Sequence, residues 1–131
     1  MYPYASVVTL AAAVLFNFLA FQVGKARVKH GVPAPGADGP PEFMRRYRTH
    51  MNTVEQAIVF LPVLWLCAIW VGDVWAGLGG AAWLAGRILY ARGYYEDPKK
   101  RGAGFVIALA ATAAMGLAAA CSMVIFLFAG Y

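Results

Sequence analysis

The sequence contains little charge. Asp, Glu, Lys and Arg make up 13% of its 131 residues, whereas 62% are hydrophobic. About a quarter of the residues in ordinary soluble proteins are charged. The composition therefore excludes a typical water-soluble domain and indicates a chain whose main solvent is lipid.

Cysteine and histidine are also scarce, with two of each. Cys67 and Cys121 lie far apart within apolar runs, which excludes a disulfide framework and favours packing as small hydrophobic groups. No residues have metal-ligand spacing, so we expect no metal or redox cofactor. His30, in the polar stretch after the first apolar run, is expected to be solvated. The N-terminus lacks the basic region of a secretory signal, so we expect the first apolar run to be retained.

Uncharged runs predict the helices. A spanning helix needs about 20 apolar residues, and residues 5–24 supply them without a charge. The run at 56–72 is shorter but extends back through Met51, and the run at 74–86 suffices only if it continues through Arg87. The last run, from Gly102, holds no charge, and its glycines and alanines, with Gly116 among them, suit close helix contact. We expect one domain, 1–131, with helices at 4–30, 41–72, 74–95 and 99–130.

All eleven Lys and Arg residues flank the first or the third connection between these helices, whereas the second connection carries only Asp73. The positive-inside rule places the basic connections in the cytoplasm and both termini on the other side, which requires an even number of spans. The net charge of +5 is thus expected to reflect orientation and contact with anionic headgroups rather than nucleic-acid binding. The Pro- and Gly-rich stretch at 31–41 predicts the first connector.

Polar residues form a stripe on the second predicted helix. At 100° per residue, Arg48, Asn52 and Glu55 fall within roughly 60° of one another, and His50 lies about 160° away. Ionisable groups at membrane depth need a partner or a function. Two interpretations stay open here: an Arg48 to Glu55 ion pair with Asn52 bonded to a neighbouring helix, or a ligand site.

The third predicted helix favours the ligand site. Arg87, Tyr90 and Tyr94 share one face near the same basic end, while Tyr95 has the position of an interfacial anchor. Cations, an amide, a carboxylate and phenols suit a small zwitterion such as glutathione, which has two carboxylates and an ammonium group. The chemistry alone does not distinguish glutathione from another amino-acid-like ligand.

Two segments resemble a known family. The run ARVKHGVPAPGADGPPEFMRRYRTHMNTVEQ, with the R-x-H-x-N-x-x-E pattern that starts at Arg48, resembles the membrane-associated proteins in eicosanoid and glutathione metabolism. The run GRILYARGYYEDPKKRGAGF is similar to the segment that joins helices three and four in microsomal glutathione transferases. The resemblance covers roughly residues 16–105.

The resemblance implies an all-α subunit of four transmembrane helices that assembles as a homotrimer, with glutathione held between subunits near the cytosolic face. It implies that Arg101 activates the glutathione sulfur. It also implies that one subunit lines the pocket with Arg48, Asn52, Glu55, Tyr90, Tyr94 and Arg101, while Arg27 and His50 reach the pocket of its neighbour. With Arg87 from the shared face of the third helix, these residues are the predicted site.

Two positions depart from the cysteinyl-leukotriene synthase branch of that family. Val28 stands where that branch has a second arginine, and Gln56 stands where it has an aromatic residue. We therefore predict a general membrane-bound glutathione S-transferase for hydrophobic electrophiles from the bilayer, with glutathione peroxidase activity as an addition. One alternative is a non-catalytic member of the fold that binds lipid or glutathione. Another is a small proton-coupled drug exporter, which the absence of a carboxylate from the first helix disfavours.

Overall fold

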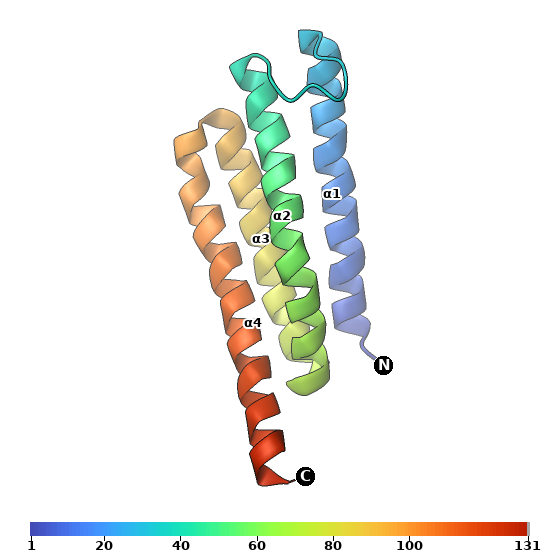
Figure 1. Cartoon of the computed structure of the whole chain (residues 1–131), viewed down its shortest axis with the longest axis vertical. Coiled ribbons are helices and arrows are strands. Elements are labelled where there is room, and N and C mark those ends of the chain that lie inside the picture. The colour runs from blue at the N-terminus through green and yellow to red at the C-terminus, as the bar shows by residue number, and fades with distance from the viewer. Residues whose placement is uncertain (131) are drawn as a thin grey trace.

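A computed structural model describes residues 1–130 of the chain. Four long helices run side by side, and the described residues form no strand (Figure 1). The elements are α1 (Pro3–His30), α2 (Pro41–Trp70), α3 (Asp73–Glu96), the short 3-10 helix η1 (Pro98–Arg101) and α4 (Gly102–Ala129). The prediction of an all-α bundle of four helices is confirmed.

The observed helix ends differ from the predicted ranges by a residue or two, except at the start of the last helix. There Pro98–Arg101 form η1, and the α-helix begins only at Gly102. The Asp97 side chain accepts a hydrogen bond from the Lys99 backbone N–H at 2.9 Å, which favours a tight turn before the helix. The second helix stops before residue 72 because Gly72 has a φ of 139°, which a helix cannot continue.

Three helical segments are long and apolar enough to cross a membrane: α1, α2 and the segment Pro98–Ala129 that combines η1 with α4. Helix α3 is not among them, because Arg87 and several glycines lower the mean hydropathy of its apolar stretch, residues 74–91. It nevertheless packs against α1, α2 and α4 and runs alongside them through the bundle (Figure 1). The start of α1 and the end of α4 lie at one end of the bundle, and the connector and η1 lie at the other, basic end.

Aromatic stacking fills the middle of the core. The Trp83 ring lies parallel to the Phe60 ring with 3.9 Å between centroids, and Phe16 meets Trp83 edge-on at 6.3 Å. Trp83 and Phe60 are fully buried, and Leu64 packs in the same cluster. This cluster joins α1, α2 and α3 at mid-depth, because one large ring from each helix contributes to it.

Glycines bring the backbones of α3 and α4 into direct contact. A Cβ atom added to Gly104 would collide with the backbone nitrogen of Tyr90, and one added to Gly86 would lie 2.7 Å from the backbone nitrogen of Ala108. The prediction of close contact along the last helix therefore holds, but Gly116 does not make it. A Cβ at Gly116 would meet only a Val63 methyl at 3.6 Å, which is ordinary contact distance.

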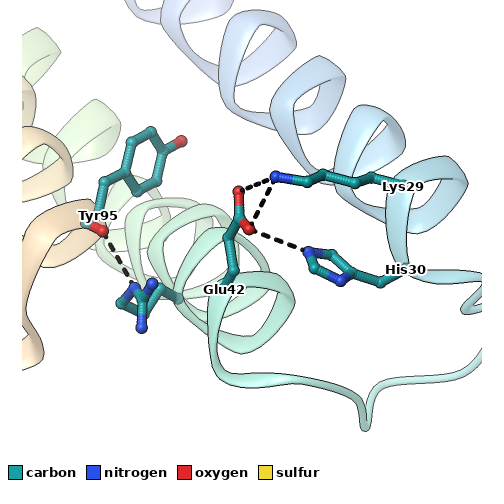
Figure 2. A network of polar contacts seen from close by, with 5 residues as sticks. Lys29, His30, Glu42 and Tyr95 are labelled. Carbon is teal, nitrogen blue, oxygen red and sulfur yellow. Dashed lines mark hydrogen bonds and ion pairs between the residues drawn. The ribbon is translucent and has the colours of Figure 1, made fainter.

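Ionised side chains tie the helices together at both ends. At the non-basic end, the Asp73 carboxylate of α3 accepts hydrogen bonds from the backbone N–H groups of Tyr4 and Ala5, at 2.8 and 2.9 Å, and so caps the start of α1. At the basic end, Figure 2 shows Lys29 and His30 of α1 converging on Glu42 of α2, at 3.0 and 3.2 Å. The expectation of a solvated His30 is wrong, because its side chain is only 18% exposed and contacts Glu42.

We predict that Gly104→Ala destabilises the fold by about 1–3 kcal/mol, because the added methyl group overlaps the α3 backbone and must force the helices apart. Gly116→Ala is the matched control on the same helix. It should be neutral or stabilising by up to about 1 kcal/mol, because alanine has the higher helix propensity. Thermal unfolding of both variants in detergent checks this, and equal stability of the two would contradict the contact.

Candidate functional site

A cavity of about 410 Å³ opens between α2, α3 and α4 toward the basic end of the bundle. It brings together several predicted site residues from three helices: Asn52 and Glu55 from α2, Arg87 and Tyr90 from α3, and Arg101 from the turn before α4. Gln56, Gly102 and Phe105 complete its lining. The cavity therefore combines two cations, one carboxylate, two amides and a phenol with an apolar ring.

Arg87 is the most deeply buried charged group of this cavity, with a relative exposure of 1%. Its Nε and Nη2 atoms donate to the Thr53 hydroxyl at 3.2 and 2.8 Å. Its guanidinium carbon lies 3.8 Å from the centre of the Tyr90 ring. A buried cation without a carboxylate partner is costly, so the hydroxyl and the ring face together stabilise it.

Tyr90 connects this arginine to the rest of the site. Its hydroxyl accepts a hydrogen bond from the Asn52 amide at 2.7 Å. Its ring packs against Tyr94 at 5.6 Å, and the guanidinium of Arg101 lies 5.3 Å from the centre of the Tyr94 ring. Tyr94 thus lies buried behind the lining and supports Arg101 rather than lining the cavity.

Glu55 is exposed at the cavity wall. Within residues 1–130 its carboxylate makes no ion pair and no hydrogen bond, and neither does the Arg48 side chain. The alternative interpretation, an Arg48 to Glu55 ion pair, is therefore wrong for this chain. The two residues are separated by roughly 10 Å along the helix axis, which is too far for a direct ion pair unless both side chains extend toward each other.

The other predicted site residues lie outside this cavity. Arg48 is exposed one helical turn above Asn52, and His50 is partly buried on another side of α2. The Arg27 guanidinium donates to the Gly36 carbonyl at 2.6 Å and lies 5.2 Å from the Phe43 ring centre. Arg27 is therefore held beside the connector. The assignment of Arg27 and His50 to a neighbouring subunit's pocket stays a prediction, and so does the assignment of Arg48 to the pocket of its own subunit.

Four residues of the site are absent from the sequence-based prediction: Thr53, Gln56, Gly102 and Phe105. Phe105 follows Arg101 by four residues, about one helical turn. The helical periodicity could therefore have predicted that both residues lie on the same face. Gln56 was noted only as a departure from a family pattern. Nothing in the sequence indicates that Thr53 binds Arg87, because a buried threonine in an apolar helix usually donates a hydrogen bond to the backbone of its own helix.

The fold and the cavity define the class: a helical membrane bundle with a charged cavity near one end. Comparison with known proteins identifies the family within that class. A sequence model of the MAPEG family matches residues 5–121, and the chain belongs to this family.

Relatives agree with that match over most of their length. The chain is 45% identical over 102 residues to an uncharacterized protein of Synechocystis sp., covering 78% of this chain and 74% of that protein. It is 38% identical over 110 residues to microsomal glutathione S-transferase 2 of Homo sapiens, covering 84% of this chain and 75% of that enzyme. Leukotriene C4 synthase of Bos taurus is 36% identical over 118 residues, covering 86% and 79% respectively.

We predict that Thr53→Val lowers the free energy of unfolding by about 2–3 kcal/mol, because it removes the hydroxyl that accepts two bonds from a buried cation. Thr49→Val is the matched control. Thr49 is equally buried on α2, but its hydroxyl donates only to the Arg45 backbone carbonyl at 2.7 Å. Its loss should amount to about 1 kcal/mol or less. Thermal unfolding in detergent would contradict the role of Thr53 if the two variants lost stability equally.

Proposed function

We propose that this protein is a membrane-bound glutathione S-transferase that conjugates glutathione to hydrophobic electrophiles from the bilayer. The observation that supports this most directly is the cavity, in which Glu55, a carboxylate without a partner in the described part of the chain, faces the same space as Arg87 and Arg101. Relatives whose names state glutathione transfer or leukotriene C4 synthesis share 35–38% identity with the chain. A proton-coupled exporter would be expected to carry its carboxylate in the first helix, whereas the carboxylate of this cavity, Glu55, belongs to α2.

The charges of the cavity complement those of glutathione. The Glu55 carboxylate suits the ammonium group of the γ-glutamyl residue, and the arginines suit carboxylates or a thiolate. The amide of Gln56 extends the set of hydrogen-bonding groups toward the peptide part of the ligand. Because the Tyr90 network already holds Arg87 in place, this cation needs little reorganisation when an anion binds.

Arg101 is the residue that we assign to thiol activation. A free thiol titrates near pH 8.5, so only a few per cent is thiolate at neutral pH. A nearby guanidinium stays protonated and favours the anion, and the start of α4 adds the positive end of a long helix dipole. The thiol proton leaves to water, the sulfur lone pair forms the carbon–sulfur bond, and the displaced electron pair leaves with the leaving group.

The apolar side of the cavity suits the second substrate. Phe105 lines the cavity and is 42% exposed on the outer face of α4, where a hydrophobic electrophile can approach through lipid. The same thiolate can also attack a hydroperoxide. With uptake of a proton this releases an alcohol and leaves glutathione sulfenic acid, which a second glutathione converts to the disulfide with release of water. Glutathione peroxidase activity therefore belongs to the proposal. A lipid- or glutathione-binding protein without catalysis would use the same cavity but would show no turnover.

The proposal includes orientation and assembly. All Lys and Arg residues belong to the helical halves that adjoin the connector or η1. By the positive-inside rule, this end of the bundle and the cavity would lie in the cytoplasm. Both termini then lie on the opposite side. In a homotrimer, Arg27 and His50 of one subunit would complete the cavity of the next.

We predict that Arg101→Ala lowers turnover at neutral pH about tenfold or more while glutathione affinity changes little. If removing the guanidinium raises the thiol pKa by about one, the thiolate fraction falls about tenfold. Ultraviolet difference spectra of bound thiolate against pH, together with kcat, provide the measurement.

Lys99→Ala is the control for Arg101→Ala, because Lys99 is an exposed cation of the same turn that does not line the cavity. It should retain the wild-type thiolate content and turnover. Wild-type values in Arg101→Ala as well would leave Arg101 as a membrane-surface anchor.

We further predict complementation between Arg27→Ala and Arg48→Ala, each inactive alone. When both variants are co-expressed, a mixed trimer can build a complete site from Arg27 of one chain and Arg48 of another. Random assembly would restore roughly a quarter of the wild-type activity. Mixed trimers without any recovered activity would show that each site lies within one subunit or that the assigned roles are wrong.

A further inference from the structure

A second, apolar groove lies between α1 and α3, away from the α2–α4 side on which the charged cavity opens. Its volume is about 380 Å³, and Ala11, Phe18, Leu19, Ile88 and Ala91 contribute to its walls. From Ala11 to Leu19 it extends roughly 12 Å along α1, close to the roughly 15 Å of hydrocarbon in one membrane leaflet. Its size and lining suit an acyl chain.

The groove ends in polar side chains at the basic end of the bundle. Arg92 and Tyr95 of α3 form its end. Beside it lies a polar hollow of about 300 Å³ between α1 and α2. Its lining comprises three cations, one carboxylate, one amide and an alanine: Lys25, Lys29, Arg46, Glu42, Gln22 and Ala26. The two spaces meet where the Arg46 guanidinium carbon lies 4.1 Å from the centre of the Tyr95 ring.

This junction contains hydrogen-bonding atoms without partners. Arg46 Nη1 and the Tyr95 hydroxyl are buried, and neither has a hydrogen-bond partner within residues 1–130. Such groups are expensive to leave unsatisfied, so each one requires an explanation. The Arg45 Nε donates to the Tyr95 carbonyl at 3.0 Å and fixes the backbone of that residue, but it leaves the hydroxyl free (Figure 2).

The cations around the junction are also unpaired. Lys25, Arg46 and Arg92 form no ion pair with a carboxylate in the part of the chain that the structure describes. The nearby carboxylates are already engaged, since Glu42 binds Lys29 and His30, and Glu96 binds Lys100 at 2.9 Å. The junction thus carries excess positive charge and free donors directly above an apolar groove.

We propose that this face of the bundle binds one anionic glycerophospholipid. An acyl chain occupies the α1–α3 groove, and the phosphate accepts hydrogen bonds from Arg46 Nη1 and the Tyr95 hydroxyl while Lys25 and Arg92 flank it. Charge complementarity selects an anionic lipid over a zwitterionic one, and the apolar groove selects a lipid over a free anion. The inference does not depend on the proposed glutathione chemistry, because it involves none of the residues that line the charged cavity.

Native mass spectrometry of the detergent-solubilised protein tests this proposal. The wild-type protein is titrated with phosphatidylglycerol and with phosphatidylcholine of identical acyl chains. Each cation close to an anionic headgroup contributes about fivefold in affinity, so we expect at least about tenfold preference for phosphatidylglycerol. The double variant Arg46→Gln/Arg92→Gln should lose most of that preference, whereas Lys99→Gln, which removes an exposed cation outside the junction, should keep it.

Two further measurements separate the possible sources of binding. Ala11→Phe fills the groove without altering charge and should weaken phosphatidylglycerol binding severalfold, and a large excess of inorganic phosphate should not displace the lipid. Equal binding of the two lipids by the wild-type protein would overturn the proposal. So would an equal loss of preference in Lys99→Gln, which would show general surface attraction, or displacement by phosphate, which would show a free-anion site.

Discussion

The contact between the backbones of α3 and α4 is the constraint on which the charged cavity depends. Gly86 and Gly104 have no side chains to separate the helices, so Tyr90 on α3 lies directly against the start of α4. This approach sets the position of Arg101, whose guanidinium lies over the Tyr94 ring. Without it, the cations of α3 and of the following turn could not face one space. A requirement of helix packing in lipid therefore also determines the geometry of the site.

The second constraint is the cost of a buried charge. Arg87 is almost completely enclosed, and the hydroxyl of Thr53 and the ring of Tyr90 compensate it in place of a carboxylate. Glu55, which contributes the carboxylate of the cavity lining, makes no ion pair within residues 1–130. A direct pair of Glu55 with an arginine would have neutralised both groups. Under the proposed function, the satisfied network around Arg87 leaves the Glu55 carboxylate available to bind the ammonium group of glutathione.

Helix number, helix type and half of the cavity lining could be predicted from the sequence by local rules, whereas Arg101 was predicted only through the family resemblance. Apolar run lengths and Pro- and Gly-rich stretches mark the helices, and the 100° periodicity puts Asn52 and Glu55 on one face, and Arg87 and Tyr90 on another. The remainder depends on contacts between distant residues. Gly104 rather than Gly116 makes the close approach, Thr53 rather than a carboxylate binds Arg87, and Glu42 captures His30. The periodicity of the sequence predicts none of these three contacts, since each depends on how one helix is rotated relative to another.

The most direct test of the account is calorimetric titration of glutathione into the detergent-solubilised protein. The wild-type protein should bind, and Glu55→Gln should bind about tenfold or more weakly, because a hydrogen bond to a charged group contributes about 1.5–3 kcal/mol. Glu96→Gln, which removes an exposed carboxylate outside the cavity, should bind like the wild type. Absence of binding to the wild-type protein, or the same affinity in folded Glu55→Gln, would contradict the assignment of the cavity.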